Sequence, residues 1–214
     1  MKKQRQPWVV GVSGASGTPY AAAVIRGLLD AGEAVDLVVS RAARLTILDE
    51  TGISFRDAYW RADLANWLAR DLDGADLAYW AAGDLAAGPS SGSYPAKGMV
   101  VVPASTAAVA GIALGLSKDL LQRAADITLK ERRPLVVVPR ETPYTRSTLR
   151  HLLDLADAGA VVLPASPAFY HGPTEVQQLV DFVAGKVLDV LGVEHTLFRR
   201  WTGELGAARA VSEK

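Results

Sequence analysis

Short apolar runs rich in valine alternate with longer segments of helical pattern along most of this 214-residue chain. Apolar runs occupy residues 8–12, 34–39, 99–102, 135–138 and 160–163, and helix-compatible segments occupy 20–30, 41–50, 106–116, 119–130, 147–157 and 175–191. Strands that are apolar throughout are typical of parallel sheets, because helices cover both faces and connect one strand to the next. The alternation therefore predicts a single-domain α/β fold, a Rossmann-like open parallel sheet with helices on both faces.

The composition limits the partners and the chemistry that such a fold can support. Lysine plus arginine equal aspartate plus glutamate at 23 each, so we expect neither nucleic acid nor a membrane as a partner. The chain has no cysteine, which excludes disulfides, thiolate nucleophiles and cysteine-ligated metals. Half of the residues are apolar, enough for one well-buried domain. We assign this domain to residues 1–202, followed by a flexible tail at 203–214.

The first seven residues form a short basic lead without the apolar core of a signal peptide. No apolar run approaches the roughly 18 residues that a membrane span needs. We therefore expect a cytoplasmic protein.

Polar residues gather directly after each predicted strand. In open α/β sheets ligands bind beyond the carboxyl ends of the strands, so these positions take priority as site candidates. They are residues 13–17, 40–41, 103–106, 139–141 and 164–167, which contain small hydroxyl side chains, prolines and one Arg–Glu pair. The segment 81–97 is rich in small residues and proline, has no apolar period, and predicts an ordered loop or flap.

The turn from Gly11 to Gly17 follows the first predicted strand and opens a helix. Its backbone N–H groups and the helix N-terminus could hold an anion, with glycines that allow close approach. The alternative is a tight strand-to-helix turn in which Ser16 serves as the N-cap. The spacing matches neither the Rossmann dinucleotide motif nor a P-loop, so both interpretations stay open.

Two groups of charged residues are candidates for phosphate binding. Arg123 and the run 130–133 place four cations along one predicted helix and just after it. These cations could hold a phosphate or could complement the helix dipole. Arg140 and Glu141 follow an apolar strand, where a ligand site is favoured over a solvated ion pair.

The sequence contains no pattern of a metal centre or a hydrolase triad. The three histidines lack metal-ligand spacing, and no Gly-x-Ser-x-Gly elbow occurs with a supporting His and Asp. We expect no metal site, and interpret His151 and His195 as helix-surface or loop residues. Trp60, Trp67 and Trp80 are interpreted as core or interface anchors.

Several motifs together carry a resemblance to a known family. They are Gly-Val-Ser-Gly-Ala-Ser-Gly at 11–17, Val-Val-Ser-Arg at 38–41, Glu-Thr at 50–51, Ser-Gly-Ser at 91–93, Leu-Lys-Glu-Arg-Arg-Pro-Leu at 129–135, Val-Pro-Arg-Glu-Thr-Pro at 138–143, Pro-Ala-Ser-Pro-Ala-Phe-Tyr at 164–170 and the run 181–192. Their order is that of the UbiX-type flavin prenyltransferases, which the chain resembles over residues 9–201. The Lys-Glu-Arg-Arg-Pro and Pro-Arg-Glu motifs are the most specific.

The resemblance implies a flavodoxin-like fold, shared with the homo-oligomeric Cys decarboxylases. It also implies a homo-oligomer, usually trimers assembled into a dodecamer, with FMN between subunits. The positions that match the family's FMN site are Gly14, Ala15, Ser16, Ser40, Ser105, Thr106, Ala107, Ala108 and Arg140. Hydroxyl groups, helix N-terminal N–H groups and a guanidinium suit a phosphomonoester.

By the same resemblance the protein is a metal-independent prenyltransferase. It transfers a dimethylallyl group from dimethylallyl monophosphate to N5 and C6 of reduced FMN, and the prenylated FMN serves a partner decarboxylase. The positions that match the allyl phosphate site are Lys130, Arg140, Tyr170 and Lys186, to which we add Arg123 from the cation group. Trp201 could stabilise allyl cation character with its aromatic face.

The reaction also needs groups that handle protons. Glu141 is the candidate to shuttle protons, with Ser16 as a relay and Glu50 as part of the polar wall near the flavin.

Two positions depart from the family pattern. Leu85 follows Asp84 in the flap, where many relatives have a tryptophan, so one π surface is missing. The segment 103–108 has fewer hydroxyl groups than in close relatives, which shifts binding toward backbone N–H groups.

Two other functions remain open. An FMN-dependent Cys-type decarboxylase has a similar Pro-Ala-Ser loop, but that group needs a catalytic histidine in its early loops and a Pro-x-Met-Asn segment, and this chain has neither. A non-catalytic flavin-binding regulatory subunit is disfavoured because Glu50, Glu141, Tyr170 and Lys186 are all present.

Overall fold

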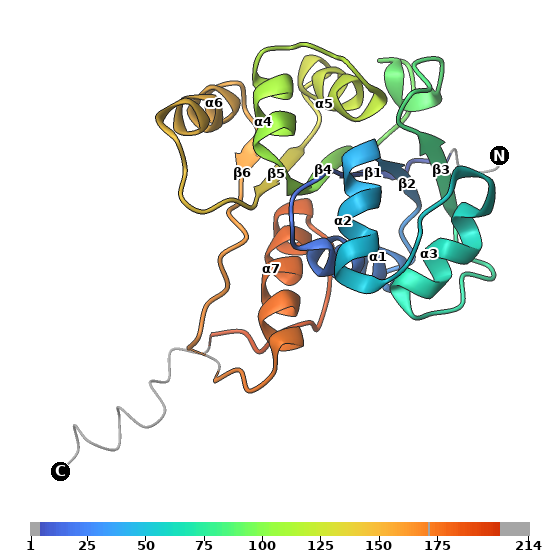
Figure 1. The fold of residues 1–214 in the computed structure, drawn as a ribbon, viewed down its shortest axis with the longest axis vertical. Coiled ribbons are helices and arrows are strands. Elements are labelled where there is room, and N and C mark those ends of the chain that lie inside the picture. The colour runs from blue at the N-terminus through green and yellow to red at the C-terminus, as the bar shows by residue number, and fades with distance from the viewer. Residues whose placement is uncertain (1–4, 171, 202–214) are drawn as a thin grey trace.

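A six-stranded parallel β-sheet forms the centre of the computed structural model, which describes residues 5–170 and 172–201 (Figure 1). The strands are β1 (Trp8–Val12), β2 (Val35–Val39), β3 (Leu77–Ala81), β4 (Gly98–Ala104), β5 (Leu135–Pro139) and β6 (Val161–Val162), in the order β3-β2-β1-β4-β5-β6. Each neighbouring pair is parallel. The predicted open α/β sheet is confirmed. The predicted tail, 203–214, lies outside the described residues.

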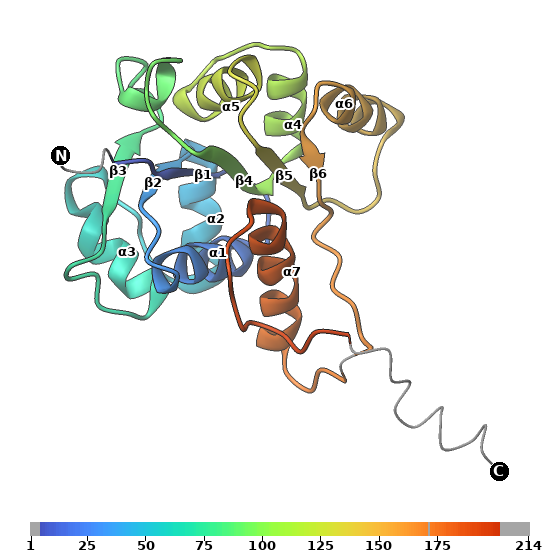
Figure 2. The ribbon, with the colours of Figure 1, turned by 180° about the vertical axis from the view of Figure 1, so that it is seen from behind.

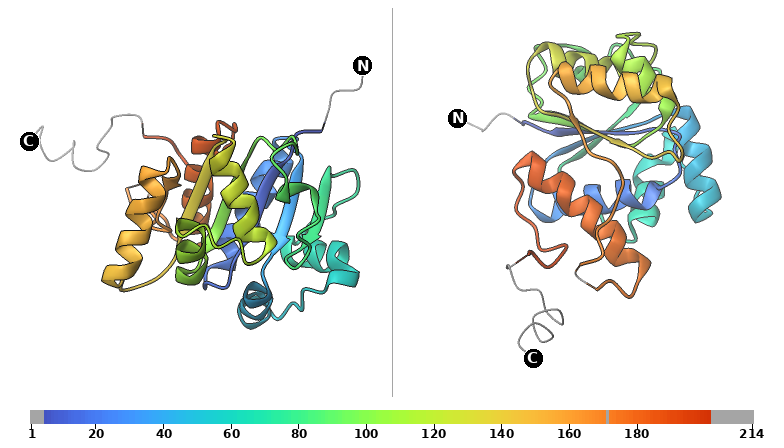
Figure 3. Two further views of the ribbon diagram at one scale, coloured as in Figure 1. Left: turned by 90° about the horizontal axis from the view of Figure 1, so that it is seen from above. Right: turned by 90° about the vertical axis from the view of Figure 1, so that its left-hand side faces the viewer.

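Helices cover both faces of the sheet and one of its ends (Figure 3). One face carries α1 (Thr18–Asp30), α3 (Trp60–Leu68) and α7 (Val176–Leu191), and the other carries α4 (Thr106–Ala113), α5 (Leu120–Lys130) and α6 (Arg146–Asp157). Alternate residues of β1 serve the two layers, with Val10 and Val12 in one core and Val9 in the other. The remaining helix, α2 (Arg41–Thr51), lies across the carboxyl end of the sheet.

The strand order reverses between β1 and β4, where the chain passes from one side of the sheet to the other. At such a switch point the connections after the two strands diverge and leave a crevice. The turns after β1 and β4 are therefore where this fold places a ligand.

The sequence patterns missed β3 and α3. The Leu77–Ala81 segment contains no β-branched residue, and most of it is only partly buried because β3 is an edge strand. The tryptophans behave as predicted: Trp67 is buried, while Trp60 and Trp80 pack against the two cores. Two short 3₁₀ turns, η1 (Asp57–Tyr59) and η2 (Gly88–Ser90), complete the described elements.

The segment 82–97 is an ordered flap, as predicted, with no α-helix or strand in it. Arg123 Nε donates to the Ser90 carbonyl, and the Arg133 guanidinium donates to the carbonyls of Gly92 and Tyr94. The Tyr94 hydroxyl donates to the Asp36 carboxylate, which is fully buried in β2. Two of the four predicted phosphate-binding cations thus hold the flap.

Beyond β6 the chain leaves the sheet and runs out to the start of α7 (Figure 2). After α7 the segment 192–201 returns along the same helix (Figures 1 and 2). Among the described residues no helix is both long and apolar enough to cross a membrane.

Candidate active site

Ser13 joins the turn after β1 to the turn after β4. Its hydroxyl donates to the Pro103 carbonyl over 2.8 Å and accepts the Ser105 N–H over 2.7 Å. The side chain is buried, so both bonds are shielded from water and fix the two turns against each other.

A hollow of about 190 Å³ opens where these turns meet α2. Its lining residues are Ser13, Gly14, Ser40, Arg41, Ala42, Ser105, Ala107, Ala108, Asp119, Leu121 and Gln122. Ser40 caps α2 by accepting the Ala43 N–H, and Ser105 caps α4 by accepting the Ala108 N–H. Three helix N-termini thus flank the hollow, because the N-cap of α5, Asp119, also lines it and its carboxylate accepts the Gln122 N–H. The N–H groups and dipoles at the starts of α2 and α4 favour an anion there.

Five residues predicted from the sequence to bind FMN line this hollow: Gly14, Ser40, Ser105, Ala107 and Ala108. Thr106 lies between two of them in the first turn of α4, and Ala15 is buried next to Gly14. Arg41 also lines the hollow and was not predicted. Its position directly after Ser40, at the start of a helix, could have pointed to it.

Gly14 is a glycine because α2 comes very close to it. A Cβ on this residue would lie 2.4 Å from the Ala42 Cβ and 3.1 Å from the Ala42 carbonyl carbon. The close approach brings the first turn of α2 against the turn after β1.

The turn residue Ser16 does not cap α1. The N-cap is Gly17, whose φ of 105° lies in a region that favours glycine. The interpretation of Ser16 as an N-cap is therefore wrong, and its side chain is exposed at the edge of the site.

Glu50, at the end of α2, occupies the N-terminus of α1. Its carboxylate accepts the Gly17 N–H and the Thr18 N–H, both over 2.8 Å, and the Thr18 hydroxyl over 2.7 Å. Partial burial raises the pKa of Glu50, but hydrogen bonds from Ser16, Thr18 and Gly17 outweigh it, so this pKa lies below its ordinary value. The predicted anion site at the N-terminus of α1 is thus filled by the protein's own carboxylate, whereas α2 and α4 are capped by the uncharged hydroxyl groups of Ser40 and Ser105.

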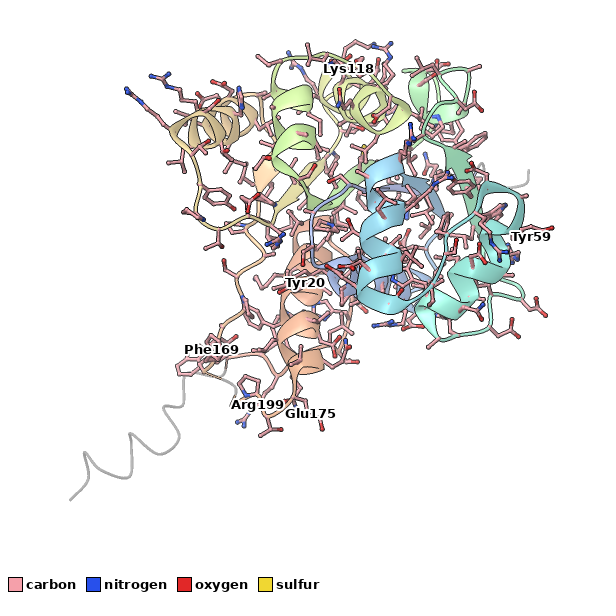
Figure 4. The ribbon with its side chains drawn as sticks, viewed as in Figure 1. Tyr20, Tyr59, Lys118, Phe169, Glu175 and Arg199 are labelled. Atoms are coloured by element: carbon pink, nitrogen blue, oxygen red, sulfur yellow. The ribbon has the colours of Figure 1, made fainter. Side chains whose placement is uncertain are left out.

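Arg140 reaches the same turn from the end of β5. Its Nε donates to the Ser16 carbonyl over 2.9 Å, and among the described residues its two Nη groups donate no hydrogen bond. The guanidinium is therefore held by one nitrogen and can bind a ligand with the others. Tyr20, labelled in Figure 4, packs against Gly17 beside the Arg140 side chain. Partial burial raises the pKa of Tyr20, and the charge of Arg140 opposes this rise.

Glu141 follows Arg140 and is exposed, and its carboxylate accepts the Thr142 N–H over 3.0 Å. The structure therefore gathers Ser16, Glu50 and Arg140 around one turn, and Glu141 follows Arg140 in the chain. These residues supply a hydroxyl group, two carboxylates and a cation, which suit proton transfer beside a bound anion.

Arg123 and Lys130 do not join this group within one chain. Arg123 bonds Ser90 and the Asp126 carboxylate, while Lys130 pairs with Glu131 beside Gly92. Lys130 ends α5 before β5 begins, whereas Arg140 follows β5. The five residues of β5 span roughly 16 Å, because a strand rises about 3.3 Å per residue.

Tyr170, Lys186 and Trp201 form a third group on α7 and the segments beside it. The Tyr170 and Trp201 rings meet edge to face, with their centroids 5.5 Å apart. Figure 4 shows Phe169, the neighbour of Tyr170, at the outer end of α7 and well apart from Tyr20. The predicted substrate-binding residues thus occupy three separate places in one chain.

The open parallel sheet places the protein in the α/β class, and residues 1–188 match the Flavoprotein family, which identifies it as a flavoprotein. The chain is 72% identical to the flavin prenyltransferase UbiX of Streptomyces coelicolor, over 95% of this chain and 98% of that protein. It therefore belongs to the UbiX flavin prenyltransferase family.

Two solved structures share its fold. One is AnUbiX (PadA1) in complex with FMN and dimethylallyl pyrophosphate, with a TM-score of 0.81, 36% identity and coverage of 94% of this chain and 100% of that chain. The other is a dodecameric FMN-dependent UbiX-like decarboxylase from Escherichia coli O157:H7, with a TM-score of 0.82, 38% identity and coverage of 92% and 100%.

Proposed function

We propose that this protein is a flavin prenyltransferase that transfers the dimethylallyl group of dimethylallyl monophosphate to N5 and C6 of reduced FMN. The observation that carries the proposal is the hollow between the N-termini of α2 and α4, directly beside the Ser16–Glu50–Arg140 group. Reduced FMN supplies the two nucleophilic atoms. The protein supplies phosphate binding, orientation and proton transfer.

The residues around the hollow fit the phosphate of FMN. Ser40 and Ser105 leave the first-turn N–H groups of two helices directed at one small space, and Arg41 adds a positive charge. Near α4 the lining residues Ala107 and Ala108 carry no hydroxyl group, so phosphate binding there would depend on backbone N–H groups. Gly14 lets α2 close on the turn after β1, and Ala15 and Ser16 continue that turn toward Arg140.

Ser16, Glu50 and Glu141 divide the acid–base work in this proposal. The lowered pKa keeps Glu50 ionised, so in this proposal its carboxylate attracts the Ser16 hydroxyl and orients that group as a relay. Glu141 is exposed and next to the cation Arg140, where it can exchange protons with the bound substrates.

The allyl phosphate site is completed by neighbouring copies of the chain, in our proposal in a homododecamer. Arg123 and Lys130 lie apart from Arg140 in one chain, and so do Tyr170, Lys186 and Trp201. Exposed apolar side chains next to the third group, Phe169 and Val176, suit burial against another subunit. The dodecameric relative supports such an assembly. We also propose a cytoplasmic location and a prenylated-FMN-dependent decarboxylase as the recipient of the product.

The decisive experiment is anaerobic incubation with reduced FMN and dimethylallyl monophosphate, followed by mass spectrometry of the extracted flavin. The proposal expects a mass increase of one prenyl unit, and an unchanged flavin mass refutes it. A parallel sample with dimethylallyl pyrophosphate determines which donor is used. A decarboxylated product from a peptide with a C-terminal cysteine would instead favour the Cys-type decarboxylase.

Shared sites can be tested with two single variants, Lys130→Ala and Arg140→Ala. Each alone is expected to lose prenylation. Dissociating, mixing and reassembling the two proteins should restore part of the activity, because some interfaces then carry both wild-type residues. No recovery in correctly assembled mixtures would place both side chains in a site within one chain.

A further inference from the structure

Asp189 is the centre of a polar cluster on α7 that the reaction scheme above does not use. Its Oδ2 accepts Lys186 Nζ over 3.2 Å, and its Oδ1 accepts Arg200 Nη2 over 2.8 Å and His195 Nε2 over 3.1 Å. The carboxylate is largely buried, with 21% of its side chain exposed. One carboxylate therefore joins the helix that carries Lys186 to the segment that leads to Trp201.

The two ring nitrogens of His195 face different partners in this cluster. Its Nδ1 accepts the Leu197 N–H over 3.2 Å, and its Nε2 lies 3.1 Å from Asp189 Oδ1 and 3.5 Å from Arg200 Nη2. His195 lies in the loop after α7, one of the two positions predicted for it, and only 3% of its side chain is exposed.

Aromatic packing also holds the segment 194–201 against α7, at Gly185. A Cβ on Gly185 would lie 2.5 Å from Phe198 Cε1 and 2.6 Å from His195 Cε1, so this glycine forms a notch for both rings. Phe198 then packs on Phe182, with ring centroids 4.9 Å apart.

Phe182 connects this packing to the third group of predicted substrate residues. Its ring meets the Tyr170 ring edge to face at 5.9 Å, and Tyr170 meets Trp201 at 5.5 Å. Phe182 and Lys186 are four residues apart, so they share one face of α7. The lysine and the two exposed aromatic rings are thus parts of one packed unit.

We propose that Asp189 and Gly185 are positioning residues for the allyl phosphate: they clamp the segment 194–201 onto α7 and so hold Lys186 and the Tyr170–Trp201 pair as one binding surface. The inference rests on the proposed function, because it takes Lys186, Tyr170 and Trp201 as ligands of dimethylallyl monophosphate. A lysine on a flexible stem loses conformational freedom when it binds a phosphate. The ion pair with Asp189 already restricts Lys186 in the protein without substrate, so less freedom is lost on binding.

The direction in which Asp189→Asn changes the affinity for the allyl phosphate distinguishes a positioning role of Asp189 from an effect of its charge. A carboxylate near a phosphate repels it, so charge alone predicts tighter binding of the substrate by Asp189→Asn. Positioning predicts weaker binding. Gly185→Ala disturbs the same clamp without any change of charge, and alanine is favoured over glycine inside a helix, so its effect reports the clash with the two rings.

The test is calorimetric titration of dimethylallyl monophosphate into protein loaded with oxidised FMN, so that binding is measured without turnover. Asp189→Asn and Gly185→Ala are each expected to weaken binding about tenfold, or about 1.4 kcal/mol. The affinity for FMN should change less than about twofold. The control is Asp181→Asn on the same helix. Within residues 5–170 and 172–201 the Asp181 carboxylate accepts a hydrogen bond only from the exposed Gln177, and the variant should behave as wild type.

Two further measurements make the outcome specific. In steady-state assays, KM for the allyl substrate should rise in both variants while kcat changes little, and Asp189→Glu should recover part of the loss. Hydrogen exchange at residues 194–201 should be faster in both variants and unchanged in Asp181→Asn. Wild-type or tighter binding by Asp189→Asn overturns the proposal, and so does an equal loss of FMN binding. If wild-type protein binds the monophosphate but leaves the flavin unchanged, the proposed function fails while the calorimetric comparison still decides the positioning role.

Discussion

Glu50→Gln tests the role of Glu50 as the cap of α1. The carboxylate accepts three hydrogen bonds of 2.7–2.8 Å from Gly17 and Thr18 at a helix N-terminus. A glutamine keeps one acceptor oxygen, turns an NH₂ group toward the remaining donors, and removes the charge that the helix dipole favours. Hydrogen bonds to a charged group contribute about 1.5–3 kcal/mol, but much of this side chain is exposed, so we expect a net loss of about 1–2 kcal/mol.

Thermal unfolding at a fixed protein concentration measures this loss. For a chain of this size each kcal/mol lowers Tm by about 2–4 °C, so Tm should fall by about 2–8 °C at pH 7. The folded pKa of Glu50 lies below its ordinary value of 4.5, so its stabilising effect is complete above that pH. It is lost as the pH falls through the folded pKa, where the Tm difference between wild type and variant should shrink.

Asp49→Asn is the matched control, because it makes the same chemical change one residue earlier on α2. Among the described residues the Asp49 side chain has no hydrogen bond or ion pair, and its substitution should leave Tm within about 1 °C of wild type. Equal Tm values for Glu50→Gln and wild type at pH 7 would refute the capping role, and so would a difference that persists unchanged at acid pH.

Three other substitutions test separate parts of the structure. Gly14→Ala should weaken FMN binding at least tenfold in a fluorescence titration and cost about 1–3 kcal/mol, because the added Cβ would lie 2.4 Å from the Ala42 Cβ, which cannot move without the backbone of α2; normal FMN affinity would contradict this. Tyr94→Phe removes the 2.6 Å bond to buried Asp36 and should lower the free energy of unfolding by about 1–3 kcal/mol in urea, with faster proteolysis within residues 82–97; an unchanged cleavage rate would show that Arg123 and Arg133 hold the flap without this bond. Glu141→Gln should bind FMN normally but slow prenylation on the order of 100-fold, measured by mass spectrometry of the flavin; wild-type turnover would move the proton transfer to another group.

The sheet could be predicted because most of its strands are central and buried on both faces. Runs such as Leu135–Pro139 are apolar throughout, and the helices between them are long enough to recognise. The Leu77–Ala81 strand escaped because its partly exposed edge position tolerates alanine, tyrosine and tryptophan in place of β-branched residues. Likewise, α3 was missed because it has only nine residues and buries a charged one. Asp63 is buried in an ion pair with Arg56, and a search for periodic apolar residues does not detect such a position.

The site was predictable where topology alone determines position. Ser40, Ser105 and Arg140 follow three parallel strands, so they must lie at one edge of the sheet. The capping role of Glu50 was not predictable, because it depends on α2 crossing the end of the sheet and bringing its last turn to α1. Arg123 shows that closeness in the sequence does not determine a side chain's partner. This cation lies near a predicted phosphate site in the sequence, and within one chain it donates a hydrogen bond to the flap at Ser90.

The separation of Lys130 from Arg140 also limits how the site can work. Arg140 is held at the carboxyl edge by Ser16, and Lys130 is held near the opposite edge by Glu131 and the flap at Gly92. A strand of five residues lies between them, so both can contact one phosphate only if they come from different chains. In that case the flap contacts of Arg123 and Arg133 have a second consequence. By fixing residues 90–94 against α5, they hold in place the surface beside Lys130 that, in the proposed assembly, one subunit presents to the next.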